Sequence, residues 1–353
     1  MSLEHVIRLA LPGKGALEAA TLAFLAECGM KVSRNNPRQY LARISSMPDL
    51  EVVFQRAADI PALVQDGDAA LGITGYDILV EYRGDGDGEG DEDGFDDDLV
   101  TLERDLGYGH CRLVVAVPET WIDVNTCADL WHLAGYYQAH KGRGLRIATK
   151  YPALTGQFLH QHGITHCKII SPHGALEAAP LTGTADLIVD LTETGTTLRE
   201  NHLKLLDDGV VLHSQACFIG NAHLLCQNEQ ALHMACLMLE LIEAHMQARN
   251  RSLLTAFIPR ENLESVQRIC DQIRAFVADS QLQISTPGHE TSNLYALSGM
   301  VNIKGSVAHL LEIVTAMRSA GAFYIHITPL TYRFAEESTS VRNLRERLKR
   351  RHE

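Results

Sequence analysis

One stretch decides how this chain folds: Asp186-Leu-Ile-Val-Asp-Leu-Thr-Glu-Thr-Gly-Thr-Thr-Leu-Arg-Glu-Asn201. Its first part, from Leu187 to Leu191, is an apolar run typical of a buried strand, and a helix-type pattern begins at Leu198. Between them lies a loop of hydroxyl-bearing residues and glycine. Backbone N–H groups are free where such a loop enters a helix, and the positive end of the helix dipole lies there too. The stretch therefore predicts a strand, a loop suited to an anion such as phosphate, and a helix.

The side chains of this loop favour a sugar phosphate as the ligand. Hydrogen-bond donors are available from Thr194, Thr196 and Thr197, and Gly195 lets the backbone approach a ligand without a Cβ in the way. Asp190, at the carboxyl end of the predicted strand, is placed to accept hydrogen bonds from two neighbouring hydroxyls, such as those of ribose. The loop is therefore predicted to clamp a ribose 5-phosphate.

A helix cap is the alternative explanation for part of the same loop. Thr197 and Glu200 have the Thr-x-x-Glu spacing of a capping box, in which each side chain satisfies a backbone N–H group at the start of a helix. One threonine and the glutamate would then need no ligand. The residues alone leave both explanations open.

The surroundings of the loop resemble a known enzyme family. The run 173–180, the glycine at position 183 and the segment 186–203 are similar to the signature of ATP phosphoribosyltransferase, which opens histidine biosynthesis. The family's phosphoribosyl-diphosphate loop has the order Asp, three residues, Thr-Gly, one residue, Thr-Leu. In this chain those positions are Asp190, Thr194, Gly195, Thr197 and Leu198.

Four further segments resemble family motifs. Pro12-Gly-Lys-Gly15 follows a predicted strand, where the family has a Lys-Gly pair that faces the substrate phosphates; a plain turn explains it equally well. Gly72-Ile-Thr-Gly-Tyr-Asp77 is also similar to the family, although a helix N-cap would explain Asp77 alone. The other two are Cys111-Arg112-Leu113 and Arg146-Ile-Ala-Thr-Lys-Tyr-Pro152.

The resemblance implies which residues bind which ligand. Phosphoribosyl diphosphate would be bound by Asp190, Glu193, Thr194, Gly195, Thr196, Thr197, Lys14, Gly15, Thr74 and Gly75, with Asp190 and Lys14 as candidate catalytic residues. ATP would be bound by Arg112, Lys150, Glu177 and Asp77. Magnesium (Mg2+) would be held mainly by substrate oxygens and water, so no protein metal ligand is expected.

The resemblance also implies the reaction, in which N1 of ATP attacks the anomeric carbon of phosphoribosyl diphosphate and diphosphate departs. Such a step needs alignment and anion stabilisation more than a nucleophilic side chain, in agreement with a sequence that offers anion loops but no nucleophile–base pair. Histidine is implied as an inhibitor, and dimers that assemble into hexamers as the oligomer. Two other functions stay open: a cytoplasmic ligand sensor without enzymatic activity, and a phosphoribosyltransferase with another acceptor.

The chain is predicted to have a two-lobed α/β core and a smaller C-terminal domain. Ligand loops at strand ends and more than one crossing indicate the two lobes, and the resemblance implies a core like a periplasmic binding protein. Residues 253–328 have the β-α-β-β-α-β order of a ferredoxin-like α+β domain, which binds histidine in the family's long form. We assign 1–98 and 182–227 to the first lobe, 99–181 to the second, 228–251 to a connecting helix, 252–332 to the regulatory domain and 333–353 to a basic tail. The tail is expected to be a solvated helix.

Charge and hydropathy exclude other classes of protein. The formal net charge is −13 over 353 residues, and nine of the negative charges lie between Asp85 and Asp98. That segment, 84–98, is glycine-rich and is expected to be a solvated linker; its partial calcium-loop match lacks the terminal glutamate and flanking helices of an EF-hand. Because there is no basic stripe outside the tail, no signal-peptide pattern and no apolar run near 18 residues, we expect a cytoplasmic protein without nucleic-acid or membrane partners.

Cysteine and histidine patterns do not predict a metal site. Eight cysteines are scattered without a C-x-x-C pair and mostly inside apolar runs, so we expect buried reduced thiols and not disulfides or zinc ligands. The 17 histidines include no H-E-x-x-H motif. His160-x-His162 is expected to be the exposed end of a helix.

Overall fold

The computed structural model describes residues 6–34, 36, 39–84, 98–171, 175–259, 283–285, 294–302, 307–319 and 321–351. The chain divides into two compact units. Unit 1 comprises residues 1–239 and 339–353, and unit 2 comprises residues 240–338. Since unit 2 is inserted between two parts of unit 1, the chain leaves the core and returns to it near its end.

The first lobe of unit 1 is a seven-stranded sheet in the order β2-β3-β4-β1-β5-β12-β6. Its strands are β1 (Ile7–Pro12), β2 (Val32–Ser33), β3 (Leu41–Ile44), β4 (Met47–Gln55), β5 (Leu71–Gly75), β6 (Leu99–Glu103) and β12 (Ala216–Asn221). Its helices are α1 (Ala16–Glu27), the short 3-10 helix η1 (Ala57–Asp59), α2 (Ile60–Gln65), α3 (Tyr76–Arg83) and α7 (Ala222–Gln227). The central strands are apolar on both faces, and Leu9, Leu71 and Phe218 are completely buried.

The second lobe is a five-stranded sheet in the order β11-β7-β10-β8-β9. Its strands are β7 (Cys111–Pro118), β8 (Leu145–Thr149), β9 (Cys167–Ile170), β10 (Leu187–Thr192) and β11 (Leu203–Ser214). Its helices are α4 (Cys127–Lys141), α5 (Pro152–Gln161), the 3-10 helix η2 (Leu176–Ala178) and α6 (Thr196–Glu200). Leu113, Ile147 and Leu187 from neighbouring strands are completely buried, so this sheet too is the centre of its lobe.

The two lobes share one strand order. In the first, β4-β1-β5 are parallel neighbours and are followed by the antiparallel strand β12 and then β6; in the second, β9-β8-β10 are followed by β7 and then β11 in the same way. The loops after β1 and β8 are therefore equivalent, and so are the loops after β5 and β10. Most of the predicted binding residues lie at or directly after the carboxyl ends of these four strands, because parallel strands present their carboxyl ends at one edge of a sheet.

The predicted return to the first lobe at residue 182 is wrong. Strand β10 pairs with β7 and β8, and β11 pairs with β7, so residues 187–214 belong to the second lobe. The chain returns to the first lobe at Gln215, immediately before β12. A buried apolar strand such as Leu187–Leu191 fits either sheet equally well, so its composition could not tell which lobe it joins.

The two crossings between the lobes, residues 104–110 and Gln215, are hydrogen-bonded to each other. The side-chain amide of Gln215 donates to the carbonyl of Arg104 over 3.0 Å. Next to it, the N–H of Ala216 donates to the carbonyl of Tyr108 over 3.0 Å. The backbone thus forms a two-stranded connection, which supports the predicted architecture of lobes joined by more than one crossing.

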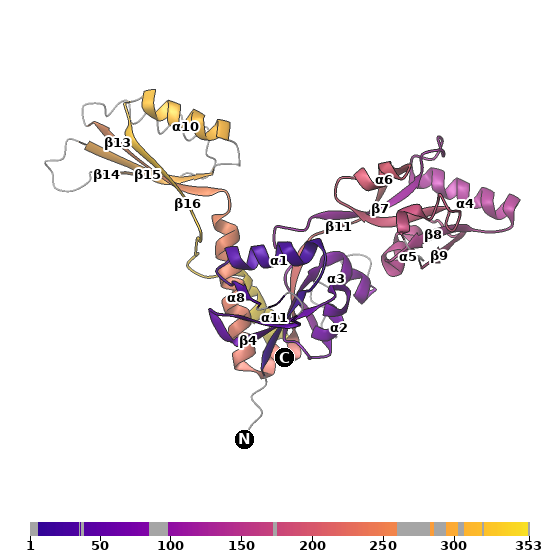
Figure 1. Cartoon of the computed structure of the whole chain (residues 1–353), viewed down its shortest axis with the longest axis horizontal. Helices are drawn as coiled ribbons and strands as arrows, with labels where there is room; N and C mark the ends of the chain where they lie inside the picture. The colour runs from indigo at the N-terminus through magenta and orange to yellow at the C-terminus, as the bar shows by residue number, and fades with distance from the viewer. Residues whose placement is uncertain are drawn as a thin grey trace, which may run out of the picture. The chain divides into compact units, whose positions relative to one another are not determined.

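Helix α8 (Glu229–Ala248) leads from unit 1 into unit 2, whose four-stranded sheet has the order β14-β15-β13-β16 (Figure 1). The strands are β13 (Arg251–Pro259), β14 (Gln283–Ser285), β15 (Leu294–Asn302) and β16 (Phe323–Pro329), and α10 (Val307–Ser319) packs on one face. This antiparallel order is that of a ferredoxin-like domain. The first helix of the predicted β-α-β-β-α-β order would follow β13 in residues 260–282, which lie outside the described ranges.

The fold class is therefore as predicted in its two-lobed α/β core and its C-terminal domain with the strand order of a ferredoxin-like sheet. No helix in the described part of the chain, α8 included, is long and apolar enough to cross a membrane.

The basic tail is not the solvated helix that its charges predict. It forms α11 (Thr339–Arg350), which belongs to unit 1 and packs against α7 and β6. Leu344 and Leu348 lie four residues apart on one face and are buried, whereas Arg347 donates to the carbonyl of Thr101 over 2.8 Å. Arg351 forms an ion pair with Asp98, the last residue of the acidic segment; residues 85–97 lie outside the described ranges. The helix packs on unit 1 through its two buried leucines. The prediction of a solvated helix considered only the charged residues and not this apolar face.

Candidate active site

The predicted phosphate loop follows β10 and is built as a tight turn. Gly195 is the N-cap of α6 and has a left-handed backbone (φ 76°), which favours glycine. Its N–H donates to the hydroxyl of the buried Thr192 over 2.8 Å, so the turn is braced from inside the protein. Outside, the side chains of Thr194, Thr196 and Thr197 are exposed. The loop therefore presents three hydroxyl-bearing side chains to solvent around a buried glycine.

The capping-box alternative does not hold. Helix α6 begins at Thr196 with Gly195 as its N-cap, so Thr197 is its second residue and Glu200 its last. No side chain caps this helix start. A capping box would need Thr197 at the N-cap position and Glu200 three residues into the helix. None of these threonines is the N-cap residue, but two of them are bonded to each other: the hydroxyls of Thr194 and Thr196 lie 2.9 Å apart, and the Thr194 hydroxyl accepts from the Thr196 N–H over 3.4 Å.

Asp190 lies on the same strand, two residues before Thr192, and is partly buried. One carboxylate oxygen, Oδ1, accepts from the N–H of Leu191 over 2.9 Å. Burial raises the pKa of Asp190, and the negative charge of Glu177 raises it further, whereas Lys150 opposes the shift. Lys150 and Glu177, two of the predicted ATP residues, thus lie close enough to act on the carboxylate of Asp190.

Arg112 is brought to the loop by strand pairing. On β7 it lies directly opposite Thr192, the last residue of β10. Cross-strand partners carry their side chains on the same face of a sheet. A guanidinium is therefore available beside the strand end from which the threonine loop begins.

The second predicted anion loop, in the first lobe, is open to solvent. Lys14 and Gly15 are both exposed between β1 and α1, and Gly15 has a left-handed backbone (φ 81°). Because β1 and β8 are equivalent strands of the two lobes, Lys14 corresponds in position to the loop of Lys150. Each lobe thus carries a lysine in the loop after the same strand of its sheet.

The third predicted loop is closed. Thr74 is completely buried, and its hydroxyl donates to the carbonyl of Ala57 over 2.9 Å. Gly75 is buried as well, and it is the N-cap of α3. The N-cap explanation for Asp77 is therefore wrong, because Asp77 is the second residue of that helix.

Asp77 is instead part of a buried hydrogen-bond network between the lobes. Ser214, at the end of β11, donates its hydroxyl to Oδ1 of Asp77 over 2.6 Å and accepts from the Asp77 N–H over 2.9 Å. Tyr151, from the second lobe, donates its hydroxyl to Oδ2 over 2.7 Å. Burial raises the pKa of Tyr151 and the neighbouring Asp77 raises it further, so this phenol is protonated over the physiological range. The network joins α3 of the first lobe to Tyr151 and Ser214 of the second lobe.

A further contact between the lobes was missed by sequence reasoning. Glu81 of α3 accepts from the N–H groups of Ala153 and Leu154, over 2.8 and 2.9 Å, at the start of α5. A carboxylate there satisfies two free donors and complements the helix dipole. No local pattern marks Glu81, because its partners lie more than 70 residues away in sequence.

Asp186, which precedes β10, has a structural role. It binds Arg143 and Arg146, and its Oδ2 also accepts from the Arg146 N–H over 2.8 Å. Burial alone would raise the pKa of Asp186, but the hydrogen bonds from the two arginines outweigh it and hold the pKa well below its usual range. The start of β10 is thereby fixed to β8. Of the signature segment before it, residues 172–174 lie outside the described ranges.

The family model and the similar proteins of known function agree on one family. Residues 56–243 match the model of the ATP phosphoribosyltransferase family. ATP phosphoribosyltransferase 2, chloroplastic, of Arabidopsis thaliana is 36% identical over 340 residues, which cover 94% of this chain and 78% of that protein. The ATP phosphoribosyltransferase of Brucella melitensis is 45% identical over 216 residues, 61% of this chain and 89% of that protein. Among solved structures, the ATP phosphoribosyl transferase (HisG:HisZ) complex from Thermotoga maritima has a TM-score of 0.48 at 27% identity, over 67% of this chain and 98% of that chain.

Proposed function

Because this chain belongs to the ATP phosphoribosyltransferase family, we propose that the loop 194–197 and Asp190 hold phosphoribosyl diphosphate. The enzyme catalyses the first step of histidine biosynthesis, in which the phosphoribosyl group is transferred to ATP. One observation carries the assignment: three exposed hydroxyl-bearing side chains surround Gly195, on the strand that also bears Asp190.

In this proposal the 5-phosphate binds to the threonine loop. Thr194, Thr196 and Thr197 can each donate a hydrogen bond, and the left-handed Gly195 keeps the backbone close to the ligand. Thr192 supports this role, because its bond to the Gly195 N–H fixes the turn before any ligand binds. Prepositioned donors bind an anion with less loss of conformational freedom. The exposed Glu193 lies at the rim of the loop.

Asp190 is proposed to accept hydrogen bonds from the two ribose hydroxyls. Its Oδ1 is already bonded to the Leu191 N–H, which fixes the orientation of the carboxylate. On the diphosphate side, the exposed Lys14 and Gly15 supply a positive charge and an open loop. Thr74 and Gly75 would contribute there only through the backbone, because the Thr74 hydroxyl is bonded to Ala57.

ATP is proposed to bind next to the same strand end, near Arg112, Lys150 and Glu177. The support is that Lys150 and Glu177 both act on the pKa of Asp190 and that Arg112 lies opposite Thr192. Asp77 is proposed to act indirectly, by holding Tyr151 beside Lys150. Two positive side chains suit a triphosphate.

Enzymes of this family use a divalent metal ion, and we propose that here it is Mg2+. Asp190 and Glu177 fit such an ion, since two carboxylates that repel each other gain from a neighbouring cation. Most ligands would be diphosphate oxygens and water, as is usual for Mg2+. When bound, the ion offsets the negative charge that grows on the departing diphosphate.

The chain's own residues align the two substrates and stabilise charge. Transfer proceeds when N1 of the adenine displaces diphosphate from the anomeric carbon of the ribose. That transition state resembles an oxocarbenium ion, so Asp190, an anion close to the ribose, is placed to stabilise it. Lys14 would stabilise the leaving group. Proximity and orientation supply the remainder of the rate enhancement.

We further propose that histidine inhibits the enzyme through the ferredoxin-like unit, that the protein acts in the cytoplasm and that it forms dimers and hexamers.

The activity and the effect of histidine are tested together. The experiment is to follow the absorbance of phosphoribosyl-ATP formed by purified protein with both substrates and Mg2+, with and without histidine. Product that histidine suppresses supports the assignment of the site and the proposal that histidine is an inhibitor. Product that histidine leaves unchanged removes the effector proposal, and folded protein that makes no product removes the assignment of the site.

A further inference from the structure

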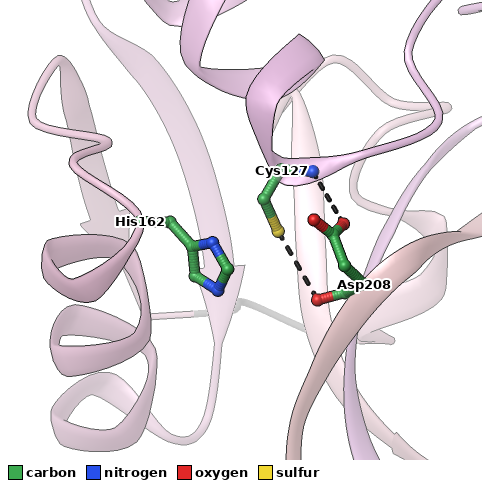
Figure 2. A group of neighbouring side chains, drawn as sticks. All are labelled: Cys127, His162 and Asp208. Carbon is green, nitrogen blue, oxygen red and sulfur yellow. Dashed lines mark hydrogen bonds between the residues drawn. The ribbon is translucent and has the colours of Figure 1, made fainter.

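Three side chains that are distant in sequence meet in the second lobe: Cys127, His162 and Asp208 (Figure 2). Cys127 is the first residue of α4, and His162 directly follows α5. Asp208 lies in the irregular part of β11, where the pairing with β7 shifts between Leu205 and Val210. The sulfur, one imidazole nitrogen and one carboxylate oxygen lie within 4.8 Å of one another.

We propose that Cys127, His162 and Asp208 form a binding site for a divalent transition-metal ion, with zinc as the best fit. Thiolate, imidazole and carboxylate are the protein ligands that Zn2+ takes, and three of them leave one tetrahedral position for water. The sulfur and nitrogen donors disfavour Mg2+ and Ca2+, which select oxygen ligands. This site is therefore separate from the Mg2+ of the proposed reaction.

Two of the ligands are held in place by each other. Asp208 accepts from the Cys127 N–H through Oδ1 over 2.7 Å, and the Cys127 thiol donates to the Asp208 carbonyl over 3.6 Å (Figure 2). Cys127 is also almost completely buried. Because Cys127 and Asp208 already lie side by side, binding an ion would cost little conformational entropy at these two residues.

His162 gives the site its third ligand and its opening to solvent. The side chain is exposed, and its ring lies 4.4 Å from that of the buried Phe158, one helical turn earlier. Figure 2 shows the imidazole turned toward the sulfur of Cys127. Ligands of tetrahedral zinc lie about 2.0–2.3 Å from the ion, hence about 3.3–3.7 Å from one another. Binding would therefore draw the exposed His162 and Asp208 side chains closer than the 4.8 Å within which the three ligand atoms now lie.

Binding must displace a proton from the thiol. Burial raises the pKa of Cys127 to about 12, with a further contribution from its hydrogen bond to Asp208, so the metal-free thiol is protonated. Zn2+ binds the thiolate strongly enough to release such protons in other protein sites.

An ion at this position would tie together α4, α5 and β11, all in the second lobe. Because the three ligands come together only in the folded lobe, the ion would bind the folded state more tightly than the unfolded chain and so raise the melting temperature. None of its ligands is a residue that we assign to phosphoribosyl diphosphate or ATP.

The test uses the full chain, freed of metal with a chelator and then titrated with Co2+ and Zn2+. We expect one equivalent of Co2+ to give a thiolate-to-cobalt charge-transfer band, and Zn2+ to abolish that band by displacement. The ligand variants are Cys127→Ser, His162→Gln and Asp208→Asn, of which the last keeps an acceptor for the Cys127 N–H. The matched controls are Cys167→Ser, in the same lobe, and His160→Gln, two residues before His162 and also exposed.

Each ligand variant should weaken Zn2+ binding at least about tenfold, whereas the controls should bind as the wild type does. A folded wild type without the charge-transfer band would overturn the proposal, and so would a band that survives Cys127→Ser. If Cys127→Ser does not fold, His162→Gln decides, because its side chain is exposed: unchanged Zn2+ affinity in that variant refutes the site.

Discussion

The Tyr151 hydroxyl lies 2.7 Å from Oδ2 of Asp77 and donates to it, so a residue after β8 of the second lobe is bonded to a helix of the first. Ser214 occupies the other oxygen of the same carboxylate, over 2.6 Å. The carboxylate of Asp77 is buried, and each of its oxygens has one hydroxyl partner. Removing either partner therefore leaves a buried acceptor unsatisfied, which costs more than the bond alone contributes.

Tyr151→Phe should lower the free energy of unfolding by about 1–3 kcal/mol, because it removes the hydroxyl from a buried carboxylate. Chemical denaturation measures this change. Tyr136→Phe is the matched control, since Tyr136 is an exposed tyrosine of the same lobe. Equal stability of Tyr151→Phe and the wild type would show that the hydroxyl contributes nothing to the connection between the lobes.

Substitutions of Glu81 should show a graded effect on stability. Glu81→Ala leaves the Ala153 and Leu154 N–H groups without their acceptor and should cost about 1–2 kcal/mol, the usual cost of losing a helix cap. Glu81→Gln keeps one acceptor oxygen and should cost less. Thermal denaturation of both variants checks the order, and a glutamine variant that is the less stable of the two would contradict the capping role.

The pH dependence of substrate capture should follow the charges around Asp190. The pKa of Asp190 is raised, and its carboxylate can accept hydrogen bonds from the ribose hydroxyls only when it is ionised. Binding of phosphoribosyl diphosphate should therefore weaken as the pH falls through this pKa. Glu177→Gln removes a charge that raises this pKa, so the acid limb of kcat/KM for phosphoribosyl diphosphate should move to lower pH. Lys150→Met should move it to higher pH. An acid limb at the same pH in all three proteins would remove Asp190 from the ribose site.

The docking of α11 depends on two buried leucines. Leu344→Ala or Leu348→Ala should lower the free energy of unfolding by about 2–5 kcal/mol, the usual range for a buried leucine. The α11 amides should then exchange with deuterium faster. Lys349→Ala, at an exposed position of the same helix, is the control. Unchanged exchange in both leucine variants would mean that the charges, and not the apolar face, hold the helix.

Local features of the candidate site could be predicted from the sequence, but the pairing of distant segments could not. The strand–loop–helix around Gly195 follows from an apolar run, a glycine and a hydroxyl cluster that are contiguous, and the structure has it at β10 and α6. The partners of Asp77 are different, because Tyr151 and Ser214 lie 74 and 137 residues away. Asp77 meets Tyr151 and Ser214 only through the tertiary structure, in which the two lobes contact each other.

The same reason explains the errors. Strand β10 belongs to the second lobe because it pairs with β7 and β8. An apolar run such as this one fits the buried centre of either sheet, so its sequence does not say which sheet it joins. Cys127, His162 and Asp208 show no motif, because the three come from separate elements. The tail was judged by its charge, although the leucines at 344 and 348 have the spacing of a buried helical face.

The threonine loop is the centre of this account, and its most direct test is the KM for phosphoribosyl diphosphate of Thr196→Ala and Thr197→Ala, measured together with the melting temperature. Hydrogen bonds to a charged phosphate contribute about 1.5–3 kcal/mol, so each variant should raise KM about 10- to 150-fold. The melting temperature should stay close to that of the wild type, because both side chains are exposed. Thr315→Ala, at an exposed helical threonine of unit 2, should change neither quantity. A KM equal to that of the wild type, or a loss of stability as large as the loss of binding, would contradict the account.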